Sequence, residues 1–200
     1  MEKLRLPAEV EPARKKLDSA FQTPVLGEWP EDEKVLTADQ PEAVAGALVG
    51  VTHQHLVNAS IAFLFQKGMK RRDHTTLAKA SKASSKVKFL TAHDFIITVN
   101  WEAWRDLRPE QRIALMDHEL AHCDRDPDTG AYTIRHHDVE EFSEIVRRWG
   151  LWQPELVSFG RAVKQLDLFA VDVIDAPDPR GLRDIADREA EEAEREVVTT

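Results

Sequence analysis

The sequence predicts an α+β fold, and three stretches carry this prediction. Residues 109–123 and residues 39–67 place apolar side chains at the spacing of a helix with one buried face. Residues 94–100 (DFIITVN) are rich in the bulky and β-branched side chains that favour strands. A chain of 200 residues can bury one sizeable core, so we expect one domain with extensions.

The chain is expected to divide into three parts. Residues 1–36 are charged and carry four prolines without a clear apolar period, which predicts an irregular or partly disordered leader. Residues 37–170 hold the predicted helices and strands and form the expected domain. Residues 171–200 are rich in charged side chains and predict an acidic C-terminal tail, helical or disordered.

The first helix of the domain is expected to begin at Asp39 and to run to about Lys67, where Gly68 ends it. His55 lies on the apolar stripe of this stretch and is expected in the core, whereas His53 is expected at the surface. A last helix is predicted from Pro154 to about Phe169, with its inner face at positions 156, 159, 163 and 166.

The helix expected at residues 109–123 begins with Pro109, whose missing N–H costs nothing in a first turn. Ile113, Met116 and Leu120 repeat at the spacing of a core-facing stripe. The proline and turn formers of residues 124–130 end the helix soon after Cys123. Cys123 itself is expected to be a small buried side chain, because no second cysteine is present to form a disulfide.

The same helix carries the motif that indicates a reaction. His118 and His122 are four residues apart, so both imidazoles lie on one side of the helix, one turn apart. Two imidazoles so placed can bind Zn²⁺, and Glu119 beside them can take the proton of a zinc-activated water. The motif therefore predicts metal-assisted hydrolysis, most often of a peptide bond, with Glu119 as general base.

A catalytic zinc site needs a third protein ligand and one open position. His137 is favoured, because it lies just before a predicted helix over residues 138–146, from which its ring could return to the first helix. The preceding histidine and three downstream glutamates remain alternatives: His136, Glu140, Glu141 and Glu144. Asp117 or Asp138 could orient a ligand histidine, as carboxylates near metal sites commonly do.

Several motifs together resemble those of the putative phage metallopeptidase family. They are DFII with Trp104, DHELAHC at residues 117–123, HDVEEF at residues 137–142 and WGLW at residues 149–152. The resemblance covers about residues 37–170. It implies a zincin-like metallopeptidase domain, with a small mixed or antiparallel sheet packed on helices and an HExxH active-site helix, encoded by a phage or prophage and distantly similar to SprT-like proteases. It also implies that His137 is the third ligand and that the strand at residues 94–100 pairs with an extended substrate.

Composition bears on location and partners. No apolar run is long enough to span a membrane and no apolar signal segment is visible, so we expect a cytoplasmic protein, in the host cell if a phage encodes it. The net charge of -9 argues against general attraction to nucleic acid. The segment Lys67–Lys88 is the exception, because eight of its residues are basic and only Asp73 is acidic. The segment therefore predicts at most a weak nucleic-acid contact.

Two classes of function follow from these patterns. The first is a zinc-dependent metallopeptidase that acts on a protein or peptide substrate. The second is a non-catalytic, zinc-containing phage module that binds host protein or DNA; the intact Glu119 argues against it, because a structural site does not need that carboxylate.

Overall fold

The computed structural model describes residues 4–71, 74–139 and 154–168. The chain divides into two compact units, Met1–His136 and His137–Thr200, and each is described by itself. The predicted tail at residues 171–200 and the glutamates Glu140, Glu141 and Glu144 lie outside the described residues.

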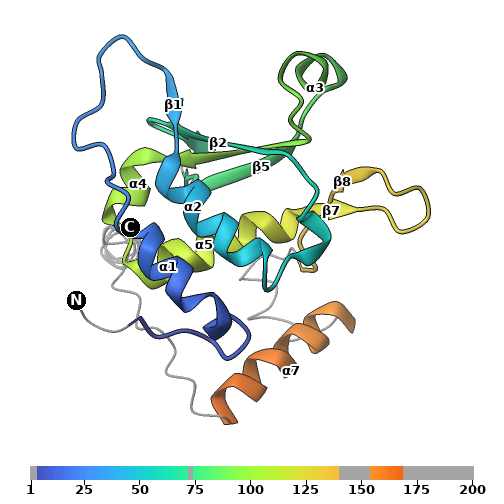
Figure 1. Ribbon diagram of the computed structural model, residues 1–200. Helices are drawn as coiled ribbons and strands as arrows, with labels where there is room; N and C mark the ends of the chain where they lie inside the picture. The colour runs from blue at the N-terminus through green and yellow to red at the C-terminus, as the bar shows by residue number, and fades with distance from the viewer. Residues whose placement is uncertain (1–3, 72–73, 140–153, 169–200) are drawn as a thin grey trace, which may run out of the picture. The chain divides into compact units, whose positions relative to one another are not determined.

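A four-stranded mixed sheet organises the first unit (Figure 1). Its order is β1 (Val35–Thr37), β2 (Ile61–Gln66), β6 (Phe95–Asn100) and β5 (Ala78–Lys82). β2 and β6 are parallel, and the two outer pairings are antiparallel. The predicted strand at residues 94–100 is thereby confirmed as β6, whose Phe95, Ile97 and Val99 are fully buried.

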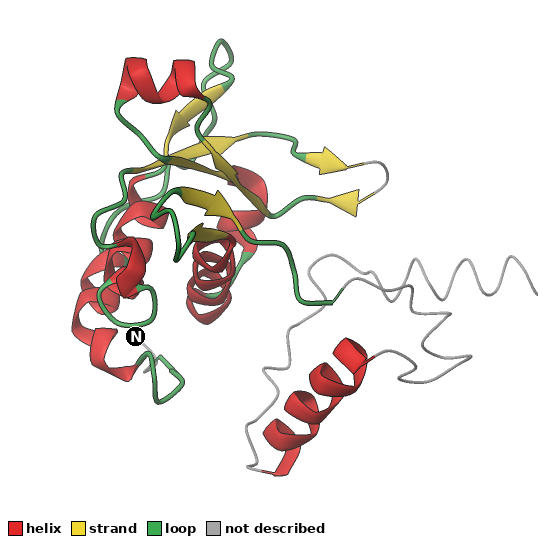
Figure 2. Ribbon diagram, turned by 90° about the vertical axis from the view of Figure 1, so that its right-hand side faces the viewer, coloured by secondary structure: helices red, strands yellow, loops and turns green. Residues whose placement is uncertain are grey.

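Helices cover one face of this sheet (Figures 1 and 2). They are α2 (Asp39–Val49) and α5 (Pro109–His122), which pack on each other, with α1 (Arg14–Ala20) packed on α2. α4 (Trp101–Asp106) follows β6 directly, and its Trp101 and Trp104 are buried, as packing residues should be. The expected α+β class is therefore correct.

The helix expected at residues 39–67 is wrong beyond Val49. The chain leaves α2 at Gly50, forms the 3-10 turn η2 (Gln54–Leu56) and then enters strand β2. Residues 61–66 (IAFLFQ) bury alternate aromatic side chains and pair along their whole length with β6. A short apolar run fits a helical and a strand period equally well, and here strand pairing decided between them.

The leader at residues 1–36 is also more ordered than expected. It contains the 3-10 helix η1 (Glu11–Ala13) and α1, whose Ala13, Leu17 and Ala20 belong to the hydrophobic core. These three residues repeat at helical spacing, but the element is too short for its period to stand out among the prolines. The division of the chain into domains otherwise stays a prediction.

Smaller elements complete the description. β3 (Lys70–Arg71) pairs antiparallel with β4 (His74–Thr75), α3 spans Ser85–Thr91, and a hairpin joins β7 (Cys123–Arg125) to β8 (Tyr132–Ile134). In the second unit, α7 (Pro154–Leu168) matches the predicted last helix. Its inner face is only partly as expected, because Leu156 is buried whereas Phe159 and Val163 are exposed. Within the described residues, no helix is both long and apolar enough to cross a bilayer.

Candidate metal centre

Helix α5 is the platform of the candidate site. Pro109 occupies its first turn, and the Gln111 side chain accepts a hydrogen bond from the Arg108 N–H (3.0 Å), so the helix start is well capped. The inner stripe is confirmed: Ile113, Met116 and Leu120 are buried. Burial of this stripe fixes the rotation of the helix and therefore the direction of the histidine row beside it.

The two histidines of the motif lie together on the outer row of α5. The ring centroids of His118 and His122 are 4.9 Å apart, with their planes nearly perpendicular. His118 is exposed and His122 half-buried, so solvent reaches both side chains. Their spacing follows directly from the one-turn separation in the sequence.

The main chain at Arg135 orients the His122 ring. His122 Nδ1 lies 2.7 Å from the Arg135 carbonyl oxygen, and the Arg135 N–H donates to the His122 carbonyl oxygen (2.8 Å). A carbonyl oxygen can only accept, so Nδ1 carries the hydrogen and Nε2 keeps its lone pair. Metal-ligating histidines commonly show this pattern, in which the second nitrogen donates to a carbonyl.

His137 is two residues beyond Arg135 and joins the pair on α5. One ring nitrogen from each of His118, His122 and His137 can be chosen so that all lie within 4.8 Å of one another. This group includes the favoured third histidine, His137, and not His136. Three imidazole nitrogens that converge in this way suit a zinc ion, whose fourth coordination position would stay open for water or substrate.

Glu119 lies on the buried side of the motif. Its side chain is 4% exposed, and burial raises the pKa of its carboxyl group. A hydrogen bond from the Ala80 backbone N–H and the nearby His122 oppose that rise. The Oε2 atom is buried without a hydrogen-bond partner. A buried carboxylate with one oxygen held and the other unpaired is poised to accept a proton.

Ala80 belongs to β5, one of the two edge strands of the sheet, and this corrects the role expected for residues 94–100. β6 pairs with β2 on one side and with β5 on the other, so it has no edge to offer a substrate. On β5, backbone bonds from Ala83 to Asp94 (2.9 Å) and from Asn100 to Leu77 (2.8 Å) show which residues face β6. The alternate residues therefore turn their backbone groups to the outer edge: Ala78, Ala80 and Lys82.

A second set of contacts fixes α5 from the loop after α2. The His53 ring donates to Asp117 Oδ1 (2.7 Å), and the Thr52 hydroxyl donates to the same atom (3.2 Å). The hydrogen bond from His53 lowers the pKa of Asp117, although burial opposes it. His55 bonds the Cys123 carbonyl oxygen (3.0 Å). These contacts tie both ends of the motif to one loop.

The two loop histidines are placed opposite to expectation. His53 is 7% exposed and buried against Asp117, whereas the side chain expected in the core, His55, is exposed. The prediction assumed that the helix continued past Val49. Residues 50–57 instead form a loop with a 3-10 turn, and in this loop His53 and not His55 faces inward. The described contacts of Asp117 are to His53 and Thr52 and not to a histidine of the motif.

Cys123 is a buried thiol, as expected. Its Sγ atom lies 3.6 Å from the Glu119 carbonyl oxygen, to which the thiol donates. Burial, with a smaller effect of the Glu119 charge, raises the pKa of this thiol to about 12. Burial and a raised pKa are typical of an inert structural cysteine.

Sequence reasoning missed two groups of this site, the Ala80 N–H and the Arg135 carbonyl. Both belong to the main chain, so no residue type marks them. Only the pairing order of the sheet and the path of the β7–β8 hairpin bring them to Glu119 and His122.

Comparison with known proteins places the chain in a family. The family model described as Putative phage metallopeptidase matches residues 34–164, which include the sheet, α5 and His137. No curated protein and no solved structure matches the chain. Because the matched region covers well over half of the sequence, the chain belongs to the Putative phage metallopeptidase family.

Proposed function

We propose that the protein is a zinc-dependent endopeptidase in which His118, His122 and His137 hold the ion and Glu119 is the general base. The family supports a metal-dependent protease that acts on proteins or peptides. The observation that carries the proposal is the meeting of three imidazoles, within 4.8 Å of one another, beside a buried glutamate with one unpaired oxygen.

The residues fit the ion on two grounds. Imidazole nitrogens are ligands that zinc prefers, and three of them leave the open position that a catalytic site needs. Leaving a buried carboxylate oxygen unpaired costs about 1–3 kcal/mol, so Glu119 Oε2 calls for a partner. When bound, zinc would supply Lewis-acid chemistry, lowering the pKa of a water molecule and polarising the scissile carbonyl group.

Glu119 performs the proton transfers in this proposal. The Ala80 N–H holds one carboxylate oxygen, so the other, Oε2, is fixed in direction. Oε2 accepts a proton from the attacking water and then delivers it to the leaving amine. Burial raises the pKa of Glu119, which strengthens it as a base and eases its protonation during the reaction.

The edge of β5 provides the place for an extended substrate. The outward backbone groups of Ala78 and Lys82 can pair with a peptide, as an added strand would. Ala80, between them, links this edge to Glu119. A peptide paired here therefore runs beside the general base.

The non-catalytic alternative is less well supported. In a module that only binds zinc for structure, burying Glu119 with one oxygen unpaired would lower the folding stability and serve no function. Location in the host cytoplasm stays a prediction.

Metal analysis of purified variants tests the ligand set. Wild type should hold about one zinc per chain, and His118→Ala, His122→Ala or His137→Ala should each weaken zinc binding severely, because two ligands cannot close a tetrahedral site. His136→Ala is the matched control and should bind zinc within a few-fold of wild type. Full occupancy in the His118→Ala/His122→Ala double variant would refute the site. A loss in His136→Ala as large as in His137→Ala would refute the choice of third ligand.

A further inference from the structure

Helix α3 (Ser85–Thr91) is unusual in this fold because none of its residues is buried. Phe89 is 89% exposed and Leu90 is 79% exposed, the two highest values among the exposed large apolar side chains of the described chain. The helix extends beyond the sheet (Figures 1 and 2). Single exposed apolar side chains are common on protein surfaces. Contiguous exposed apolar side chains, such as this adjacent pair, more often indicate an interaction site.

Hydrogen bonds cap α3 at both ends. The Ser84 side chain accepts a hydrogen bond from the Val87 N–H (3.3 Å), which caps the start. The Thr91 hydroxyl donates to the Val87 carbonyl oxygen (2.8 Å), and Ala92 adopts a left-handed conformation at φ 62° to end the helix. These local bonds fix the helix without burying it.

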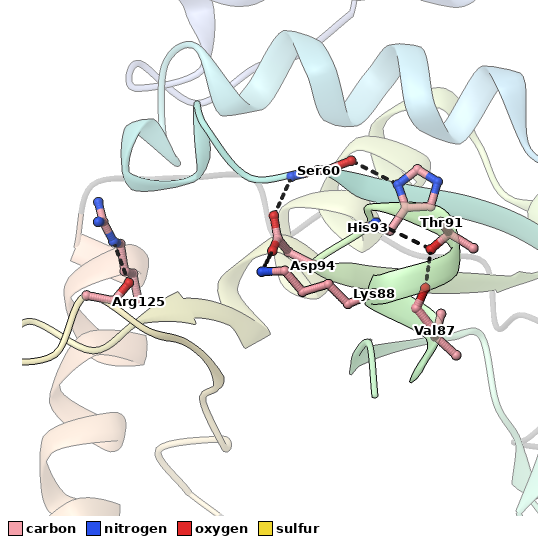
Figure 3. Close-up of polar contacts among 8 residues, drawn as sticks. Ser60, Val87, Lys88, Thr91, His93, Asp94 and Arg125 are labelled. Carbon is pink, nitrogen blue, oxygen red and sulfur yellow. Dashed lines mark hydrogen bonds and ion pairs between the residues drawn. The ribbon is translucent and has the colours of Figure 1, made fainter. Parts of the chain in front are cut away.

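One ion pair attaches α3 to the body of the first unit. Lys88 Nζ lies 2.5 Å from Asp94 Oδ1, and the other oxygen of Asp94 accepts from the Ser60 N–H (3.0 Å; Figure 3). Ser60 also bonds His93 (2.9 Å), which follows the helix. Phe89 and Leu90 are therefore presented in a fixed geometry, and a partner that binds them does not have to order the helix first.

α3 is continuous with the edge strand of the candidate site. Only Ala83 and Ser84 separate it from β5, whose Ala80 bonds Glu119. An extended chain paired with the outer edge of β5 therefore passes α3 at one end of the strand. Lys82 and Lys86 are exposed on this path.

We propose that α3 is a substrate-binding surface that receives a segment of the protein substrate outside the cleaved bond, with Phe89 and Leu90 contacting apolar side chains and Lys82 and Lys86 contacting acidic ones. The identity of the partner as substrate rests on the proposed peptidase function. The pairing of an apolar pair with nearby lysines selects substrates that combine apolar and acidic residues, in keeping with charge complementarity.

Other partners suit this surface less well. Single-stranded nucleic acid requires successive aromatic side chains on which bases stack, and α3 offers Phe89 beside an aliphatic Leu90. Stable attachment to a membrane needs a larger apolar face than two side chains. Both remain outcomes that the experiment can reveal.

Binding measurements in the Glu119→Gln background separate this proposal from catalysis. The probes are fluorescently labelled β-casein, which is unfolded and acidic, and reduced, carbamidomethylated lysozyme, which is unfolded and basic. Phe89→Ser/Leu90→Ser should weaken β-casein binding at least about tenfold, because two apolar contacts are lost. Val57→Ser, which changes another exposed apolar residue (67% exposed), is the matched control and should bind as the background protein does.

Charge reversal sharpens the test. Lys82→Glu/Lys86→Glu should weaken β-casein binding and strengthen binding of the basic lysozyme chain. β-casein binding that is absent, or unchanged in both double variants, overturns the proposal, as does a loss confined to oligo-dT or to phosphatidylserine vesicles. Binding that depends on α3 in a protein whose Glu119-intact form cleaves nothing would instead reject the peptidase function and leave the surface in place.

Discussion

Helices α5 and α3 lie in the same unit and are built on opposite principles. α5 buries Ile113, Met116 and Leu120. The loop that follows α2 also bonds Asp117 within the helix and Cys123 just after it. α3 buries no residue and is fixed by its own caps and by the Lys88–Asp94 pair. Both helices have well-defined ends, but of the two only α5 is held by the hydrophobic core.

The difference indicates that the two helices have different tasks, because α5 would position the groups for catalysis and α3 would contact the substrate. Metal ligation and proton transfer tolerate little displacement, so their groups lie on the helix that the core fixes. A surface that contacts variable side chains gains from exposure, and the caps of α3 give it shape without burial. Changes in α5 should therefore alter chemistry or stability, and changes at the exposed apolar residues of α3, Phe89 and Leu90, should alter binding alone.

The largest effect is expected at Glu119. Glu119→Gln keeps the shape and the hydrogen bond with Ala80 but cannot accept a proton, so proteolysis should fall by about 10²–10⁴-fold with zinc content unchanged. Zinc analysis and a β-casein cleavage assay measure the two quantities. Glu110→Gln, the same change at the start of α5, is the control and should retain activity. Loss of zinc from Glu119→Gln would mean that Glu119 is a ligand.

The next effect concerns the core face of α5. Leu120 is fully buried one residue from Glu119, and Leu120→Ala removes side-chain volume that the surroundings cannot refill. Such substitutions cost about 2–5 kcal/mol of unfolding free energy. Urea unfolding followed by circular dichroism measures the loss. A change below about 1 kcal/mol would show that α5 is not held by the core as described.

A smaller effect should follow from detaching α3. Lys88→Met removes the partner of Asp94, which is 8% exposed, but the lysine is itself largely in water, so the loss should be about 1 kcal/mol or less. It should be seen in urea unfolding at pH 7.

The pH dependence of that loss provides its control. Burial acts to raise the pKa of Asp94, but hydrogen bonds from Lys88 and the Ser60 N–H, with the charges of Lys88 and His93, outweigh it and leave the pKa lowered. A lowered carboxyl pKa gives stability that is complete above its unfolded value of about 4 and is lost as the pH falls through the folded value. The difference between wild type and Lys88→Met should shrink on acidification. A difference that grew would contradict the ion pair.

The smallest effect is expected at Leu90. Leu90→Ala is the same chemical change as Leu120→Ala, but the side chain is already in water, so the unfolding free energy should stay within about 0.5 kcal/mol of wild type. The two leucines thus form a matched pair for one unfolding experiment. Similar losses at both positions would remove the distinction between the two helices.

The parts of the fold that sequence predicted are those set by local spacing. α5 begins with Pro109 and ends at His122, and its apolar stripe is as expected, because helical period and end signals lie within one segment. β6 was likewise predicted from its own composition. The position of His118 beside His122 follows from the helix alone.

What sequence did not predict depends on pairing between distant segments. Residues 61–66 became a strand because β6 was available beside them, and this placed His53 inside and His55 outside. The edge strand beside Glu119 is β5 and not residues 94–100, because the order of strands depends on pairing between segments and cannot be read from any one of them. The meeting of His137 with α5 was anticipated, and its role as a ligand stays a proposal.

The contacts at Ala80 and Arg135 have an evolutionary consequence. An N–H and a carbonyl oxygen of the main chain orient Glu119 and His122, so replacing the side chain at either position leaves the bonding group in place. Proline at position 80 is the exception, because it removes the donor. A change of side chain at either position therefore keeps the orientation of the motif wherever the backbone keeps its path, and at position 80, which packs against the core, this condition favours small residues.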